Sequence, residues 1–376
     1  MNVIDSNYFL SDFFRDKLLK KENQKVAEFI SFISQVDSIG DYPSFEIAMK
    51  EMERLYTNKK FIFSIKRAFG ESLLYGHLHA IAEYAKLSDE DIRYFPIMEH
   101  GVDFWEMVKK PSYPRVFQGR YLHDKWRDLN KGIPSFYIGP YIYYAQSAYS
   151  EEEISELKRK NGKTLLIVPA HTHEMAEQSY DMEKFVDTVM QRCSPYYDTI
   201  MVLAYWADLK YDLYSLFQKA GAKVVSAGFR GDPNFISRLK TLLLLADTVI
   251  GNDLGTFVGY GFFLGKDVYL IENDVELSLH DTELDTGNVV YQNNLQLFMN
   301  AFGREINKDK QTLLCEQFWG SKEIKSPLEI RDILQVNCCI LKKAKGQINA
   351  IPKAVNACIH SSELTHSQRD LLLASI

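Results

Sequence analysis

The feature that most constrains the fold is a regular alternation of strand and helix patterns between residues 163 and 271. Apolar runs typical of buried strands occur at 163–169, 199–204, 222–227, 248–250 and 267–271. Helical patterns separate them: one at about 181–193, one from Asp208 to Gly221, one after Asp232-Pro233 and one from 254. Strands and helices that alternate at this spacing form a parallel sheet with helices on both faces. The region therefore predicts a Rossmann-like domain.

The N-terminal half is less regular. It favours helices at 9–34, 44–57, 67–87 and 120–131 and strands at 93–98, 114–118 and 135–139. These elements predict a second, smaller Rossmann-like domain, and the chain after 275 predicts helices to the C-terminus. The fold class is thus α/β, with two Rossmann-like domains facing a cleft and extra helices at both ends. The predicted domains are 1–147, 148–335 and a helical tail, 336–376; a capping box from Ser150 to Glu153 follows the first boundary.

Composition limits the class of protein. The chain has 376 residues, 46% hydrophobic and 25% charged, which is typical of a soluble globular protein with two domains. A net charge of −6 argues against nucleic acid as the main partner. Five cysteines without CxxC spacing favour a reducing compartment.

No signal peptide and no apolar run long enough to cross a bilayer is visible, so we expect a cytoplasmic protein. Residues 9–31 mix aromatic and basic side chains, and residues 338–376 carry five Lys/Arg against two Asp/Glu. Either segment could make a peripheral contact with the anionic surface of the inner membrane. A solvated helix packed on its own domain is the simpler interpretation.

Ligands of parallel sheets bind beyond the carboxyl ends of the strands. The residues that follow the predicted strands of 163–271 are, in order, His171, His173 and Glu174; Tyr205 and Trp206; Arg230; Asn252 to Thr256; and Glu272. Arginine suits phosphate, and a carboxylate can bind sugar hydroxyls. Plainer interpretations stay open: the histidines could be structural, the aromatic pair could be core, and Arg230 could only pair with Asp232. A metal site is poorly supported, because His171, His173 and Glu174 have no further ligand at a telling distance.

The stretch Gly251-Asn252-Asp253-Leu254-Gly255-Thr256 leads from a predicted strand into a predicted helix. Free N–H groups and the positive end of the helix dipole at such a turn suit a phosphate. Gly255 would let a ligand approach the backbone, and the Thr256 hydroxyl could donate another hydrogen bond. The alternative is an ordinary capped helix start. No GxGxxG motif is present, so a dinucleotide oxidoreductase is poorly supported.

In the first half, Glu99 and His100 end a predicted strand, and Asp103 follows closely. If the two domains face each other, this turn lies opposite the phosphate loop. A carboxylate or histidine there could take a proton from an acceptor hydroxyl as general base. The alternative is a capped strand end with a buried histidine.

Five stretches, taken in order, resemble bacterial glycosyltransferases of capsule and lipopolysaccharide assembly. They are EHG (99–101), GPYIYYA (139–145), PAHTHE (169–174), GFRGDPNFISRLK (228–240) and NDLGTFVGYGFFLGK (252–266). The resemblance covers residues 93–275 and implies the two-domain GT-B architecture, a donor held by the C-terminal domain and no obligatory metal. It implies that Arg230 and residues 254–256 hold the donor phosphate and that His171 and His173 lie near the phosphate or the transferred sugar. The family often has serine and histidine where this chain has Gly251 and Phe257.

Together these patterns predict a metal-independent, inverting glycosyltransferase without a cofactor. Its donor would be a nucleotide-sugar (CMP-Kdo or another CMP-, UDP- or GDP-sugar), and its acceptor a glycan or lipid-linked glycan of surface polysaccharide or lipopolysaccharide. Catalysis is assigned to Glu99, His100 or Asp103 as base. The donor is assigned to His171, His173, Glu174, Arg230, Asn252, Gly255, Thr256 and Glu272. Two alternatives remain: a nucleotide-sugar epimerase of the UDP-N-acetylglucosamine 2-epimerase type, and a non-catalytic glycan- or nucleotide-binding protein.

Overall fold

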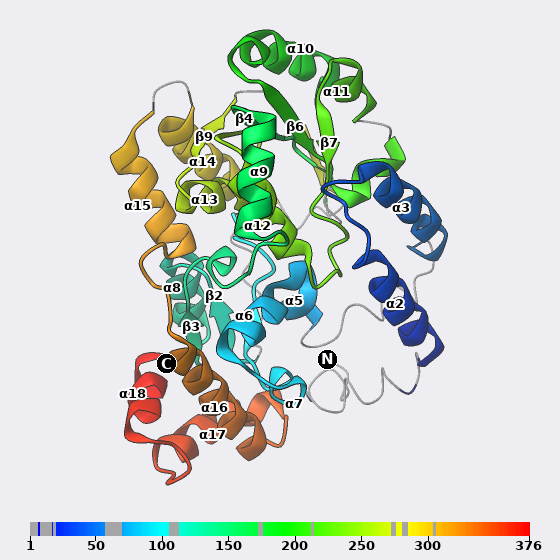
Figure 1. The fold of residues 1–376 in the computed structure, drawn as a ribbon. Helices are drawn as coiled ribbons and strands as arrows, with labels where there is room; N and C mark the ends of the chain where they lie inside the picture. Colours follow the sequence, from blue (N-terminus) through cyan, green and yellow to red (C-terminus); the bar gives the residue numbers. More distant parts are fainter. Residues whose placement is uncertain are drawn as a thin grey trace.

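Two separate parallel sheets organise the computed structural model, and Figure 1 shows the larger above the smaller. The structure describes residues 7, 17, 20–56, 70–104, 113–171, 176–211, 214–271, 276–279, 285–303 and 306–376.

The larger sheet has five parallel strands in the order β7-β6-β4-β8-β9. Its strands are β4 (Thr164–Val168), β6 (Thr199–Leu203), β7 (Lys223–Val225), β8 (Thr248–Gly251) and β9 (Asp267–Leu270). The helices that connect or flank them are α9 (Glu151–Asn161), α10 (Met182–Cys193), α11 (Ser215–Lys219), α12 (Phe235–Leu245) and α13 (Thr256–Phe263). Since all five predicted strands are present and parallel, the Rossmann-like prediction for this region is confirmed at the level of the sheet.

Apolar side chains cover both faces of this sheet. In β4, Leu165 and Ile167 belong to one buried cluster, and Leu166 and Val168 belong to the other. Alternate residues of a strand point to opposite faces, so a strand buried on both faces has a continuous apolar sequence, as TLLIV does.

The smaller sheet has three parallel strands, β1 (Ile97–Met98), β2 (Arg115–Phe117) and β3 (Ser135–Tyr137), in that order. Each is shorter than predicted. Helix α8 (Arg120–Leu129) connects β2 to β3. One hydrophobic cluster contains residues from both sheets, among them Val116 of β2 and Val249 of β8. The two sheets therefore share a continuous core.

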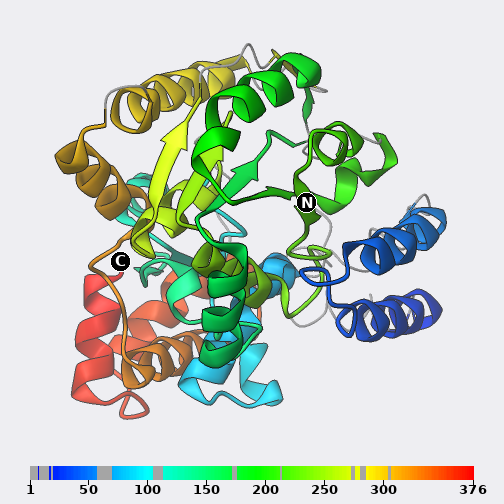
Figure 2. The same cartoon turned by 45° about the horizontal axis from the view of Figure 1, so that its top comes forward.

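Helices precede the smaller sheet, and the first two lie to one side of the molecule in both views (Figures 1 and 2). They are α2 (Lys20–Ile33), α3 (Tyr42–Tyr56), α5 (Gly70–Leu73), α6 (His77–Ala85) and α7 (Asp89–Ile92). The predicted helix over 67–87 is interrupted by a short 3-10 turn, η1 (Leu74–Gly76). A second such turn, η2 (Tyr141–Tyr143), follows β3.

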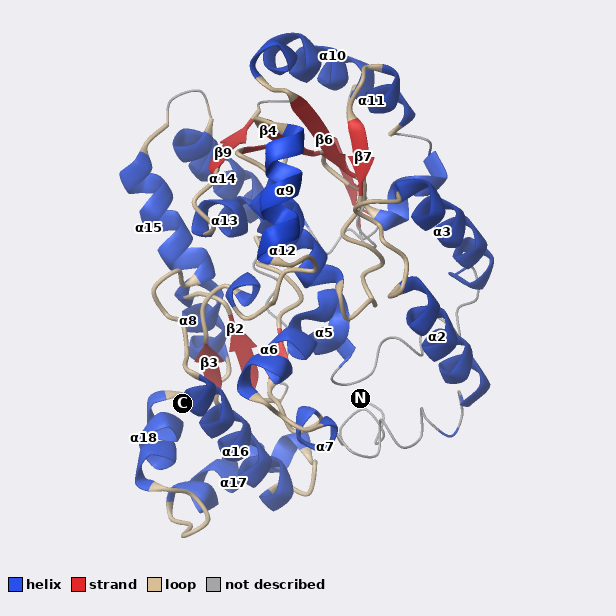
Figure 3. Cartoon of the chain, in the orientation of Figure 1, coloured by secondary structure: helices blue, strands red, loops and turns tan. Residues whose placement is uncertain are grey.

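The C-terminal chain is helical, as predicted: α14 (Asp285–Phe302), α15 (Lys308–Trp319), α16 (Pro327–Lys343), α17 (Ile351–Ile359) and α18 (His366–Ala374). Helices α16 to α18 lie beside the smaller sheet (Figure 3). Asn337 of α16 donates to the carbonyl of Tyr94 at 2.7 Å, and the N–H of Ser135 donates to the carbonyl of Ser375 at 2.9 Å. The C-terminal helices therefore pack against the part of the chain that contains the smaller sheet.

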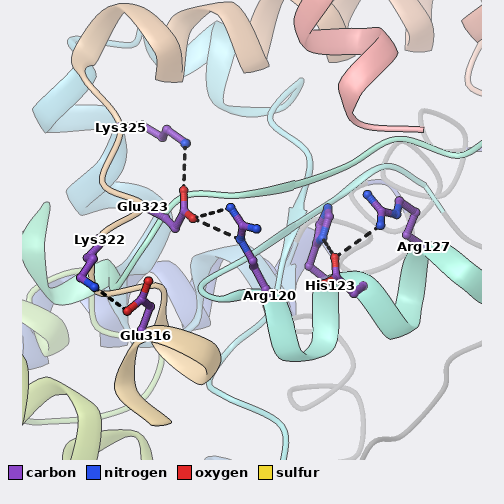
Figure 4. A network of polar contacts seen from close by, with 8 residues as sticks. Arg120, His123, Arg127, Glu316, Lys322, Glu323 and Lys325 are labelled. Carbon is purple, nitrogen blue, oxygen red and sulfur yellow. Dashed lines mark hydrogen bonds and ion pairs between the residues drawn. The ribbon is translucent and has the colours of Figure 1, made fainter. Parts of the chain in front are cut away.

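Ion pairs fix the segment between α15 and α16 to α8 (Figure 4). Arg120 donates two hydrogen bonds to Glu323 Oε1, at 2.8 and 3.2 Å, and Lys325 lies 3.8 Å from the other oxygen. Arg120 is exposed, so each contact contributes little to stability on its own.

Three predicted features differ from the structure. The helix expected from Asp208 is instead a 3-10 turn, η4 (Trp206–Tyr211), and α11 begins at Ser215. Helix α12 begins at Phe235, because the Asp232 carboxylate accepts from the N–H of Asn234 and does not cap the helix. A small antiparallel sheet, β5 (Ala176–Ser179) with β10 (Glu276–Leu279), was not predicted. Among the described helices, none is long and apolar enough to span a bilayer.

Candidate functional site

The strand order places a switch point between β4 and β8, the neighbouring strands from which the chain continues to opposite sides of the sheet. Open parallel sheets bind ligands at such points. The loops after these two strands are held together, because Asn252 Oδ1 accepts a hydrogen bond of 2.7 Å from the N–H of Ala170. Asn252 is buried, so its side chain positions the loop that leads to His171.

The predicted phosphate loop is closely packed around its glycines. A Cβ on Gly251 would lie 2.3 Å from Cζ of Phe257, and one on Gly255 would lie 2.8 Å from Cδ1 of the same ring. Phe257 therefore occupies the space beside both glycines, and on that side of Gly255 the expected room for a ligand to approach the backbone is filled. Asp253 accepts hydrogen bonds from the N–H of Leu254 and from the hydroxyl of Tyr291.

The loop after β1 meets the start of α13. A Cβ on Gly101 would lie 3.0 Å from Oγ1 of Thr256. The carboxyl end of the smaller sheet, which carries Glu99 and His100, thus touches the helix start predicted to bind phosphate. The structure brings these sequence-predicted residues together from segments about 155 residues apart.

A line of rings connects the two sheets. His171 stacks on Tyr205 with ring centroids 3.9 Å apart. The Tyr205 hydroxyl forms a hydrogen bond of 3.2 Å with the hydroxyl of Tyr75, whose ring stacks with His100 at 6.3 Å. Two histidines predicted from opposite halves of the chain therefore belong to one aromatic cluster, which we define as His171, Tyr205, Tyr75 and His100.

Tyr75 is held in an unusual backbone conformation, with φ 58° and ψ 16°. A bulky residue rarely adopts this left-handed region without a tertiary constraint. Here the N–H of Tyr75 donates to the carbonyl of Arg230 at 2.6 Å. The next residue, Gly76, is so close to Pro233 that a Cβ there would lie 2.2 Å from its carbonyl oxygen. The strained turn thus attaches η1 to the loop after β7.

Arg230, whose carbonyl accepts from Tyr75, is largely buried. Its guanidinium carbon is 5.3 Å from the centroid of the Trp206 ring, a cation–π arrangement. Asp232 pairs with Arg238 in place of the suggested pairing with Arg230, since Asp232 Oδ2 accepts from Nη1 of Arg238 at 2.6 Å. That buried ion pair also holds the loop that carries Arg230.

Glu99 is the most perturbed acid of the site. Burial raises its pKa to about 8; the N–H of Gln118, which donates to Oε1 at 2.7 Å, opposes this rise, Asp103 adds to it, and Arg115 opposes it. Glu99 is therefore mainly protonated at neutral pH. His77 is also buried, and burial together with nearby His100 lowers the pKa of its imidazole to about 3, so His77 is neutral.

The remaining predicted residues divide into two groups. Asp103 is half-buried and near enough to Glu99 to affect its titration. His173, Glu174 and Glu272 lie outside the described residues. Within the described part of the chain, no group of three or more His, Cys, Asp or Glu side chains could hold a metal ion.

Sequence patterns missed several residues of this region: Tyr75, His77, Gln118, Tyr141 and Tyr260. His77 lies in a predicted helix. Tyr141 and Tyr260 lie in two of the stretches that carry the family resemblance, but no role was assigned to them. Gln118 is the last residue of the predicted strand 114–118 and directly follows the observed β2, so the rule that identified Glu99 at a strand end could also have identified Gln118.

Comparison with known proteins adds little. No protein-family model matches the chain, and no curated protein matches it. Among solved structures, the crystal structure of UGT89C1 from Arabidopsis thaliana, a plant UDP-glycosyltransferase, is similar over 75% of this chain, with 10% sequence identity and a TM-score of 0.29. The chain spans 64% of the length of that structure. A likeness of this size carries no argument about fold or function.

Proposed function

We propose that this chain is a glycosyltransferase that transfers a sugar from a nucleotide-sugar to a glycan or lipid-linked glycan. The observation that carries the proposal is the meeting of two parallel sheets at their carboxyl ends. The loop after β1 contacts the start of α13, and the aromatic cluster joins His100 to His171. Parallel-sheet ligands bind at such ends, and a donor and an acceptor need two facing surfaces. The domain limits 1–147, 148–335 and 336–376 stay a prediction.

In this proposal the donor phosphates lie at the N-terminus of α13, near Thr256. Departure of the nucleotide builds negative charge on the leaving phosphate, and helix N–H groups meet that charge. His171, half-buried beside Tyr205, would contact the phosphate or the sugar. Arg230 is only 6% exposed, so in this proposal it stabilises the phosphate by its positive charge and not by direct contact.

His100 is the base that the geometry favours. It is exposed at the end of β1, whereas Glu99 is buried with one oxygen engaged by Gln118. A general base must reach the proton that it removes, so exposure favours His100. The proposal has three more specific parts. The reaction inverts the anomeric carbon, the donor is CMP-linked, such as CMP-Kdo, and the acceptor belongs to surface polysaccharide or lipopolysaccharide.

A thermal-shift panel tests the proposal. The full chain is melted with CMP, UDP, GDP and CDP, and one nucleotide is expected to raise the melting temperature selectively, because ligands that bind the native state stabilise it. The corresponding nucleotide-sugar is then incubated with the protein alone. A transferase is expected to give only slow hydrolysis, and a new sugar nucleotide would instead indicate an epimerase. No shift with any of the four nucleotides would contradict the proposal.

A further inference from the structure

A buried polar cluster lies between the two sheets, beside the candidate site. It consists of Glu99 after β1, Gln118 after β2, Tyr141 of η2 and Tyr260 of α13, and we refer to it as the Glu99 cluster. All four side chains are at least nine-tenths buried. They come from both halves of the chain, so the Glu99 cluster is a group of polar side chains buried within the hydrophobic core that the two sheets share.

Several of its hydrogen bonds are made within the protein. Glu99 Oε1 accepts from the N–H of Gln118, and Gln118 Oε1 accepts from the N–H of Tyr141 at 3.3 Å. The Tyr141 hydroxyl donates to the carbonyl of Val116 at 3.2 Å. Three atoms remain. Glu99 Oε2, Gln118 Nε2 and the Tyr260 hydroxyl make no well-formed hydrogen bond with any residue that the structure describes.

These three atoms lie near one another. Burial raises the pKa of Tyr260 well above its ordinary value and Glu99 raises it further, whereas a hydrogen-bonding contact with the Gln118 side chain lowers it. Gln118 contacts both of the others, because its N–H donates to Glu99 Oε1 at 2.7 Å and its side chain meets the Tyr260 hydroxyl. Buried polar atoms in native proteins nearly always have a partner, and where the protein supplies none, a bound water molecule or ligand group usually does.

The chemistry of the three atoms indicates what the partner is. Glu99 is mainly protonated at neutral pH, Gln118 offers an uncharged amide N–H, and Tyr260 offers a hydroxyl. The two charged groups that face Glu99, Asp103 and Arg115, act on it in opposite directions. A neutral set of donors and acceptors fits an uncharged group that both donates and accepts, rather than a phosphate or a cation.

We propose that Glu99 Oε2, Gln118 Nε2 and the Tyr260 hydroxyl bind one uncharged hydroxyl group. Its source is either a resident water molecule or a sugar. A sugar is the second source because the loop after β1, which carries Glu99 and Gly101, contacts Thr256 at the start of α13, where the donor is proposed to bind. The sugar source rests on the proposed glycosyltransferase function, and the water source does not.

The Tyr260→Phe variant tests this subsite through the direction of its effect. If a hydroxyl group is bound, removing the phenol oxygen breaks a buried hydrogen bond, and the melting temperature falls by on the order of 2 °C. If nothing is bound, the hydroxyl has only its poorly formed contact with Gln118, and the melting temperature changes little or rises. Tyr144→Phe is the matched control, because the buried Tyr144 hydroxyl donates to Ile138 and accepts from Lys325, so its loss must destabilise.

Full-length wild type and both variants are melted in buffer and with glucose, galactose or N-acetylglucosamine. A lower melting temperature of Tyr260→Phe in buffer supports a resident water. An unchanged or higher value in buffer, with a sugar-induced rise that wild type shows and Tyr260→Phe lacks, supports a sugar hydroxyl. If Tyr260→Phe melts at or above wild type and no sugar shifts either protein, the subsite does not exist. The nucleotide panel is independent of this result, so failure of either proposal is recognised separately.

Discussion

Replacing Glu99 with glutamine is expected to remove a loss of stability that the wild-type chain undergoes as the pH rises from 4.5 to about 8. The folded chain holds a proton on Glu99 that the unfolded chain has lost over this range. The stability of wild type relative to Glu99→Gln should therefore fall by about 1.4 kcal/mol per pH unit, and by about 5 kcal/mol over the whole range. Above about pH 8 the difference should level off.

Urea unfolding of both proteins at several pH values measures this difference. Glutamine can still accept the hydrogen bond from the N–H of Gln118, so the variant keeps the local geometry. His77 contributes a slope of the opposite sign between pH 6.5 and about 3, since its neutral form is favoured in the folded chain. That slope is common to both proteins and cancels in the comparison. A pH-independent difference would mean that folding leaves the pKa of Glu99 unchanged, which would contradict the prediction.

Replacing Asp232 with alanine is expected to lower the free energy of unfolding by about 3–5 kcal/mol, because the buried Arg238 guanidinium loses its ion-pair partner. Both side chains are buried, and Arg238 also donates to the carbonyl of Ser34 at 2.8 Å. The pair thus fixes the loop of Arg230 against the N-terminal helices. Chemical denaturation of the full chain measures the loss.

A double variant separates the ion pair from general packing. Arg238→Met in the Asp232→Ala background removes the uncompensated charge, so the double variant should be more stable than Asp232→Ala alone. If the second substitution instead adds a further loss of similar size, the loop does not depend on the pairing of these two charges.

Much of the larger sheet could be predicted from the sequence. The runs that became β4, β6, β8 and β9 are apolar because both faces of the sheet are covered, and that burial is visible in composition alone. The capping box of Ser150 and Glu153 formed as predicted, since its geometry is set within one turn of helix. The rule that ligands bind at strand ends placed His100, His171 and Thr256 on segments that the structure brings together.

What could not be predicted depends on contacts between distant segments. The left-handed turn at Tyr75 is imposed by Arg230 and Pro233, and residues 67–87 alone carry an uninterrupted helical pattern. Strands β5 and β10 pair with each other across about a hundred residues, and the sequence AEQS of β5 has no strand pattern of its own. The raised pKa of Glu99 follows from burial between two sheets, which no local pattern reports.

The central claim is that the loop after β1 and the start of α13 belong to one ligand site. Hydrogen exchange of the full chain, with and without the nucleotide that stabilises it most, tests this directly, because bound ligands protect the amides that they cover. We predict slower exchange in peptides that contain 251–257 and also in peptides that contain 97–103. Protection confined to one of these segments, or found only elsewhere in the chain, would contradict a shared site.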